Sequence, residues 1–167
     1  YGDWMHIWNE LSQTSGKKVG YANMVGNVPR LTQVTEGDAY VPEMDLYIPL
    51  EFWFCRNPGL ALPLIALQYH EVKINIEFND LSDCLMKYST TVPADFSQIT
   101  LTNTNVMESA SLWVDYIYLD TDERRRFAQL SHEYLIEQLQ YPGEETISVT
   151  SNKIKLAFNH PVKELVW

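Results

Sequence analysis

The four histidines and two cysteines are the residues of this sequence that could bind a metal or act as catalytic groups. A zinc-protease helix carries a second histidine four residues after the first, and neither His70 nor His132 has one. Cys55 and Cys84 form no CxxC pair and no disulfide framework, so free thiols are favoured over a single bridge. The spacing therefore predicts no metal site, with His70 and His132 hydrogen-bonded to backbone instead.

Other catalytic patterns are also missing from the sequence. It contains no G-x-S-x-G motif for an activated serine and no glycine-rich phosphate loop. Glu144 and Glu145 follow a Pro-Gly turn and are expected to be solvated rather than catalytic. Trp4 and Trp8 could form a platform for a sugar, but their spacing is more typical of the buried face of a helix. We therefore predict no catalytic residue and no enzyme.

Four arginines are the candidates for interaction with a partner. Arg56 stands at the end of a predicted strand, within reach of solvent or another subunit. Arg124, Arg125 and Arg126 form a basic cluster directly after several acidic residues. A solvated helix face with weak local salt bridges is the default explanation for such a cluster. The hypothesis is that these four residues form ion pairs at an interface.

The acidic composition limits the partners that the chain could have. There are 12 Lys and Arg residues against 22 Asp and Glu residues, which gives a net charge of −10. Such a surface repels phosphate backbones, so no direct binding to nucleic acid is expected. No apolar run approaches the roughly 20 residues that cross a membrane, so no membrane insertion is expected either. The chain is 46% apolar and rich in aromatic residues, which is enough for a hydrophobic core.

Two short helices are predicted, one at the start of the sequence and one near residue 125. Trp4, Ile7, Trp8 and Leu11 recur with helical spacing, which predicts a helix from Asp3 as N-cap to about residue 11. Residues 17–43 are predicted to be an irregular connection with a short helix near 21–25. Asp120 and Glu123 have capping-box spacing, which predicts a second helix over 122–130.

Most of the remaining sequence follows the two-residue period of β-strands. Strands are predicted over 44–54, 71–78, 112–120, 134–139, 153–158 and 162–167. The strand over 112–120 is apolar on both faces, which indicates burial on both sides. Asn57-Pro58-Gly59 is predicted to form a type II turn, and 79–110 a long polar loop with one hairpin. Short strands and turns without a βαβ rhythm predict an all-β fold, an antiparallel β-sandwich with short helices.

Four blocks of the sequence resemble one family of viral proteins. They are YGDWMHIWNEL (1–11), PGLALPLIALQYHEVK (58–73), LWVDYIYLDTDERRRFAQLSHEYLIEQLQ (112–140) and FNHPVKELVW (158–167). These blocks are similar to the major capsid protein of nucleocytoplasmic large DNA viruses, in the form found in algal and giant viruses. The resemblance is collinear over nearly the whole chain and is uninformative only in the loops at 12–43 and 79–110.

The resemblance implies a double jelly roll made of two eight-stranded sandwiches. Residues 1–120 would form the later part of the first jelly-roll domain, 121–131 a linker helix, and 132–167 the beginning of the second jelly-roll domain. It also implies a structural subunit, with no required cofactor, that forms homotrimeric, pseudo-hexagonal capsomers in the icosahedral shell of the virion. Its partners would be itself, neighbouring capsomers and minor capsid proteins, with assembly in the host cytoplasm.

Two alternatives remain open at this point. The chain could belong to a minor capsid paralogue, which its abundance in purified particles would decide. It could also be a non-catalytic carbohydrate-binding jelly roll, since a fold does not fix a function, and a glycan array would decide that.

The chain begins at Tyr1 and stops at Trp167, directly after a strand-like segment, and we expect it to be an internal fragment of a longer protein. Residues 1–167 expressed alone should then aggregate or misfold, because strand edges would be left unpaired. Size-exclusion chromatography and thermal melting test this prediction. A soluble monomer with a sharp cooperative transition would contradict it.

Overall fold

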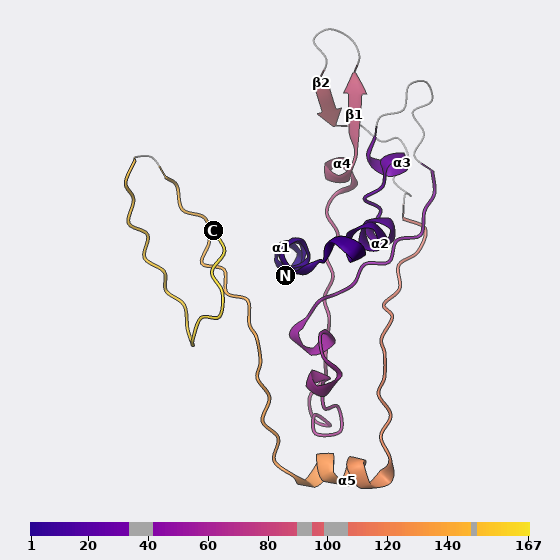
Figure 1. Ribbon diagram of the computed structural model, residues 1–167, viewed down its shortest axis with the longest axis vertical. Coiled ribbons are helices and arrows are strands. Elements are labelled where there is room, and N and C mark those ends of the chain that lie inside the picture. The colour runs from indigo at the N-terminus through magenta and orange to yellow at the C-terminus, as the bar shows by residue number, and fades with distance from the viewer. Residues whose placement is uncertain (34–41, 90–94, 99–106, 148–149) are drawn as a thin grey trace. The chain divides into compact units, whose positions relative to one another are not determined.

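The computed structural model describes residues 1–33, 42–89, 95–98, 107–147 and 150–167 of the chain (Figure 1). The chain divides into two compact units. The first unit comprises Tyr1–Lys18, Pro49–Ala61 and Glu133–Trp167, and the second comprises Val19–Ile48 and Leu62–His132. Each unit therefore brings together segments that are far apart in the sequence.

The first unit begins with helix α1, Gly2–Ser12, which confirms the helix predicted from the spacing of its apolar residues. Tyr1 precedes the helix as its N-cap, so the prediction of Asp3 in that role is wrong. Asp3 lies instead in the first turn, where the positive end of the helix dipole stabilises a carboxylate. Met5 and Asn9 are buried, and the Asn9 side-chain amide donates a hydrogen bond of 2.8 Å to the carbonyl oxygen of Met5.

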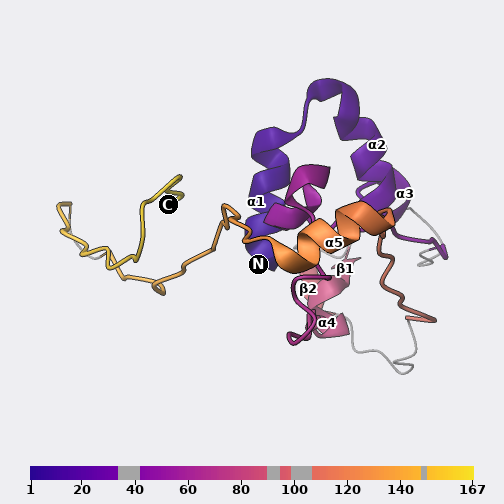
Figure 2. The same cartoon turned by 90° about the horizontal axis from the view of Figure 1, so that it is seen from below.

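Two short 3₁₀ turns, η1 (Trp53–Cys55) and η2 (Pro58–Leu60), follow in the first unit and lie beside α1 (Figure 2). They correct two predictions, because residues 53–55 are not a strand and the turn at Asn57 is not of type II. The Asn57 side-chain oxygen accepts a hydrogen bond of 2.8 Å from the backbone N–H of Gly59. That cap, with proline at the first position of the turn, favours a 3₁₀ geometry in which Gly59 needs no positive φ.

The last part of the first unit holds two extended stretches together through one side chain. The Gln140 amide donates to the carbonyl oxygen of Asn159 at 3.1 Å and accepts from the N–H of Asn159 at 2.9 Å. His160 follows in the left-handed region at φ 66°, and Gly143 takes φ 103° at the predicted Pro-Gly turn. The side chain of Gln140 thus supplies the donor and acceptor that a neighbouring strand would supply.

The second unit begins within helix α2, which spans Ser15–Val25 and is longer than the short helix predicted near 21–25. Gly26 follows it at φ 81°, and helix α3 spans Pro29–Thr32. The backbone N–H of Tyr47 donates to the carbonyl oxygen of Met24 at 2.8 Å, so the chain near residue 47 packs against the end of α2.

The second unit continues with helix α4, Leu81–Cys84, and an antiparallel hairpin of strands β1 (Met86–Ser89) and β2 (Asp95–Gln98). In the hairpin Met86 lies opposite Gln98. The structure thus confirms a hairpin inside the predicted polar loop over 79–110.

Helix α5, Thr121–Gln129, confirms the second predicted helix and its cap. The Asp120 carboxylate accepts a hydrogen bond of 2.8 Å from the N–H of Glu123. After the helix, the His132 ring stacks on Phe127 and its Nε2 lies 2.9 Å from the carbonyl oxygen of Phe127. His132 is therefore hydrogen-bonded to backbone, as predicted.

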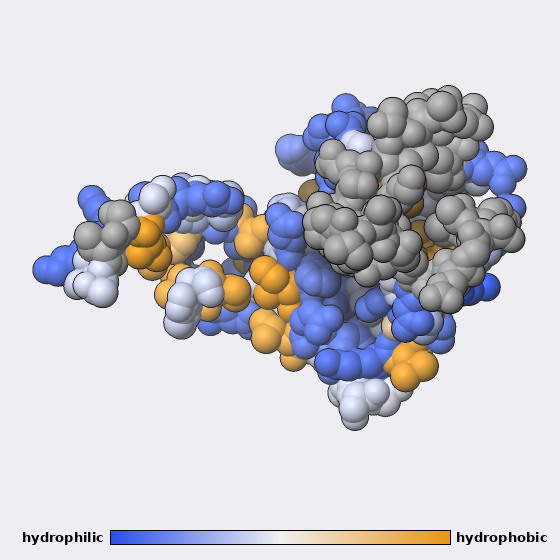
Figure 3. All heavy atoms as spheres, turned by 90° about the horizontal axis from the view of Figure 1, so that it is seen from above, coloured by the Kyte–Doolittle hydropathy of each residue, from blue (hydrophilic) through white to orange (hydrophobic). Residues whose placement is uncertain are grey.

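Within the described ranges, β1 and β2 are the strands that pair. The strands predicted from the two-residue period lie outside ladders, and the one over 44–54 ends in η1. The predicted strand over 112–120 is exposed: the exposed fraction is 87% for Trp113 and 91% for Tyr118. Apolar side chains reach the surface elsewhere too (orange in Figure 3). The β-sandwich thus stays a prediction. In the part of the chain that the structure describes, no helix is long and apolar enough to span a bilayer.

We expect Gly26→Ala to destabilise the full-length protein by about 1–2 kcal/mol, because a residue with a Cβ resists positive φ. The added Cβ would also lie 2.8 Å from a Leu46 methyl group, which is flexible enough to move aside. Chemical denaturation measures the change in the free energy of unfolding.

Gly20→Ala is the matched control, since Gly20 lies inside α2 and an added Cβ would meet nothing within 4 Å. Removing a helical glycine should stabilise the protein by about 0.5–1 kcal/mol. Equal effects of the two substitutions would contradict the assignment of Gly26 as a conformational requirement.

Candidate functional site

Arg56 lies at the centre of the best-defined side-chain cluster in the first unit. It follows η1, and its guanidinium carbon lies 3.8 Å from the centroid of the Trp8 ring. One guanidinium nitrogen donates a hydrogen bond of 2.7 Å to Glu137, and another lies 3.4 Å from the carbonyl oxygen of Glu51. Only 19% of the Arg56 side chain is exposed. The predicted solvent-facing arginine is therefore engaged within the chain.

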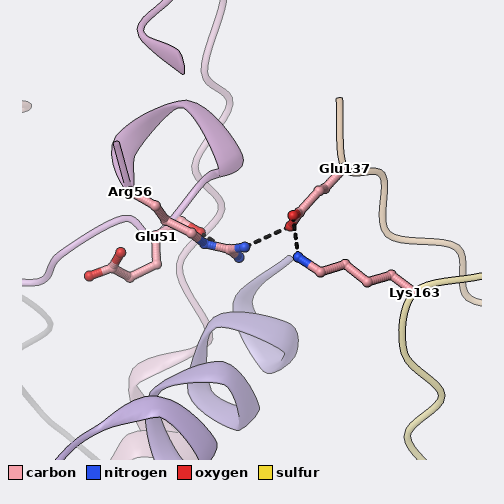
Figure 4. Close-up of polar contacts among 4 residues, drawn as sticks. All are labelled: Glu51, Arg56, Glu137 and Lys163. Atoms are coloured by element: carbon pink, nitrogen blue, oxygen red, sulfur yellow. Dashed lines mark hydrogen bonds and ion pairs between the residues drawn. The ribbon is translucent and has the colours of Figure 1, made fainter. Parts of the chain in front are cut away.

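Glu137 bridges Arg56 to a second cation. Figure 4 shows the carboxylate of Glu137 between the Arg56 guanidinium and the Lys163 ammonium, each of which donates to a different carboxylate oxygen. The hydrogen bond from Lys163 is the largest cause of a lowered pKa for Glu137, and the charges of Lys163 and Arg56 act in the same direction. Desolvation opposes this shift without reversing it. Glu137 is thus held as a carboxylate.

The two ion pairs of Glu137 differ in their surroundings. Lys163 is 63% exposed, and a pair with an exposed lysine contributes at most about 1 kcal/mol. Arg56 is mostly buried, and its Nε atom is buried without a hydrogen-bond partner. A guanidinium that is removed from water loses more when its anion is taken away. We therefore expect the Arg56–Glu137 pair to dominate the cluster.

An aromatic group positions Arg56 against α1. The Tyr1 and Phe52 rings lie 5.6 Å apart, and Phe52 stacks on Phe54 at 5.2 Å. Trp4 and Trp8 lie 6.2 Å apart on α1. These contacts hold the 52–54 segment beside the helix and bring Arg56 over the Trp8 ring, which therefore stacks on a cation of its own chain.

The arginine cluster on α5 belongs to the second unit, and its ion pairs with the described residues are local. Arg125 lies 3.4 Å from Asp122, and Arg126 lies 3.6 Å from Glu123. Both are exposed pairs three residues apart on one helix, and each contributes tenths of a kcal/mol. The Arg124 side chain has no ion pair with the residues that the structure describes. The default explanation, a solvated helix face, fits this geometry.

The sequence did not point to Glu137 and Lys163. Each lies in a predicted strand, and neither residue belongs to a motif. Glu137 is 81 residues from Arg56, so their pairing depends on a fold that no local pattern shows. A single carboxylate among the apolar residues of YLIEQLQ was the available signal.

Among the described residues, neither a metal-binding group nor an activated thiol is found. Among them no group of three His, Cys, Asp or Glu residues could hold a metal ion. Cys55 and Cys84 are free thiols, as expected. Desolvation is the main cause of a raised pKa for Cys55, which disfavours its thiolate form.

Comparison with known families decides what kind of protein carries this cluster. The family described as "Major capsid protein N-terminus" matches residues 1–120, and the one described as "Large eukaryotic DNA virus major capsid protein" matches residues 123–167. The chain belongs to the major capsid proteins of large eukaryotic DNA viruses. We call residues 1–120 the N-terminal family segment and residues 123–167 the second family segment.

Individual capsid proteins are similar over the whole chain. The major capsid protein of Pyramimonas orientalis virus is 57% identical, and that of Phaeocystis pouchetii virus is 51% identical. The major capsid protein of Chrysochromulina ericina virus is 49% identical. In each comparison all of this chain is covered, together with 37%, 36% and 33% of the relative's length, respectively. The chain thus spans about a third of these capsid proteins. No solved structure matches it.

Membership of the capsid family confirms the resemblance seen in the sequence. The names of these relatives say that they are major capsid proteins. The relatives are named for the shell that they build, and the chain matches them from its first residue to its last.

Glu137 gives the cluster a defined dependence on pH. Because the pKa of Glu137 is lowered in the folded chain, its carboxylate stabilises the fold above the ordinary carboxyl pKa of about 4.3. This contribution is lost as the pH falls through the lowered value. Glu137→Gln should therefore reduce the melting temperature of the full-length protein at pH 7 and have a smaller effect near pH 3.

The control is Glu145→Gln, which removes one exposed carboxylate elsewhere in the first unit. Its effect on the melting temperature should be small at pH 7. A difference between wild type and Glu137→Gln that stays constant from pH 7 to pH 3 would contradict the role of the Glu137 charge.

Proposed function

We propose that this chain is part of the shell subunit of a large DNA virus, which forms homotrimeric, pseudo-hexagonal capsomers. The capsomers would tile an icosahedral shell, contact minor capsid proteins, and assemble in the host cytoplasm. The observation that carries the proposal is the similarity to proteins named major capsid protein over the whole chain, at up to 57% identity among those described above.

The proposed architecture is a double jelly roll. Residues 1–120 would form the later part of the first jelly roll, 121–131 the linker helix, and 132–167 the beginning of the second. The boundary between the two family matches supports this division. The first match ends at residue 120 and the second begins at 123, on either side of the start of α5 at Thr121. The antiparallel hairpin and the two-residue apolar period of the extended segments support the β class.

Exposed apolar side chains support a role in assembly. The segment over 112–118 exposes more than half of each of its large hydrophobic side chains: Leu112, Trp113, Val114, Tyr116, Ile117 and Tyr118. Contiguous apolar surface of this kind marks an interface in a soluble protein, and aromatic residues are enriched at interface cores. We propose that strands of the jelly rolls or neighbouring subunits cover it.

The proposed partners are other capsid proteins rather than the genome. A net charge of −10 gives the chain no general attraction for the phosphate backbone. The carbohydrate-binding alternative is weakened at Trp8, because the Arg56 guanidinium lies over its ring. The names of the three relatives favour a major over a minor capsid protein.

The native mass of the full-length protein tests the proposal. Light scattering on a sizing column should give three times the mass of one polypeptide, unchanged over a hundredfold range of concentration. The reason is that the apolar strands would be buried permanently between subunits. A monomer at all concentrations would contradict the trimeric capsomer.

A further inference from the structure

We propose that Arg56 is a clamp between the two family segments, so that the start of the second segment depends on the N-terminal segment for its stability. The clamp consists of Trp8, Arg56, Glu137 and Lys163. The inference rests on the family matches and on the contacts within the first unit. It does not depend on the trimer, but its test uses amides of 134–140 and 162–167 that strand pairing in the double jelly roll would protect.

The clamp joins residues that the family comparison assigns to different segments. Trp8 and Arg56 lie in the N-terminal family segment, and Glu137 and Lys163 lie in the second. All four lie within one compact unit of the structure. The Arg56–Glu137 hydrogen bond of 2.7 Å therefore crosses from one segment to the other. The Lys163–Glu137 pair and the Gln140–Asn159 contacts stay within the second segment.

Contacts within the N-terminal family segment position Arg56 independently of Glu137. Its guanidinium plane contacts the Trp8 ring, and one of its nitrogens approaches the Glu51 carbonyl oxygen. The Asn57 cap fixes the backbone on the other side. A side chain that is already ordered loses little further conformational entropy when it binds a carboxylate. The N-terminal segment therefore presents a preformed cation to the second segment.

The Arg56–Glu137 contact matters to both family segments, because the buried guanidinium of Arg56 needs an anion. The side chain is 19% exposed, and its Nε is buried without a hydrogen-bond partner. Glu137 is 34% exposed and has Lys163 as a second partner, so it keeps a neutralising neighbour if Arg56 is lost. Among the residues that the structure describes, Glu137 is the ion-pair partner of Arg56, so its loss leaves the guanidinium without an anion. The clamp thus also favours the N-terminal segment, and each segment stabilises the other.

An intrachain role also explains why Arg56 differs from the arginines on α5. Arg125 and Arg126 pair with acidic residues three positions away and remain mostly exposed. Arg56 pairs across 81 residues and is mostly buried. Its hydrogen-bonding atoms are turned toward its own chain, which leaves the α5 arginines as the better candidates for contacts between subunits.

Hydrogen exchange measured by mass spectrometry on the full-length protein tests the clamp. Arg56→Ala should accelerate exchange at the amides of 134–140 and 162–167 by roughly tenfold, the factor that corresponds to about 1.4 kcal/mol. Arg125→Ala removes the same charge from α5 and should leave these amides unchanged. Acceleration confined to 49–61, or amides of 134–140 that are unprotected in the wild type, would overturn the proposal.

The reciprocal substitution keeps the test decisive if Arg56→Ala does not fold. Glu137→Gln should accelerate exchange at the amides of 52–58, which lie in the other family segment. The double variant with Arg56→Lys and Glu137→Gln should exchange little faster than Glu137→Gln alone, because the loss of the planar guanidinium matters little once its carboxylate partner is gone. Additive effects of the two, or no effect of Glu137→Gln at 52–58, would overturn the clamp.

Discussion

The first unit depends on where the positive charge of Arg56 is placed. A guanidinium that is mostly removed from water needs both an apolar surface for its plane and an anion for its edge. Trp8 provides the surface and Glu137 provides the anion. Each comes from a different part of the chain, so one side chain brings three distant segments together. The aromatic contacts between Tyr1 and Phe52 add area to the same junction.

Local signals in the sequence were sufficient to predict α1 and α5. The apolar spacing that includes Trp4 and Trp8 predicted α1, and the Asp120 cap predicted α5 almost to the residue. Both signals act within four residues, so no knowledge of the fold was needed. The prediction of a type II turn at Asn57 was wrong, and the cause is also a local contact. The Pro-Gly pair suggested a type II turn, but the Asn57 side chain satisfied the Gly59 N–H and favoured a 3₁₀ turn.

The candidate site was harder to predict because its contacts are not local. Arg56 was proposed as a candidate for an ion pair at an interface, and the structure shows it paired with Glu137 of its own chain. No period or motif connects Arg56 with Glu137, since only the path of the chain brings them together. Strand pairing has the same difficulty: the alternation over 112–120 indicates apolar faces without saying what covers them. The sandwich remains a prediction for this reason, while the family is established by comparison.

The contact between Gln140 and Asn159 has a consequence for how this chain could tolerate changes in length. The Gln140 side chain hydrogen-bonds both the N–H and the carbonyl oxygen of Asn159. These bonds hold the segment that follows Asn159 beside Gln140 whatever the length of the chain between the two residues. Insertions and deletions between Gln140 and Asn159 can then alter a loop while Lys163 stays within reach of its carboxylate. A single glutamine thereby separates the part of the chain that can vary in length from the part that must keep its register.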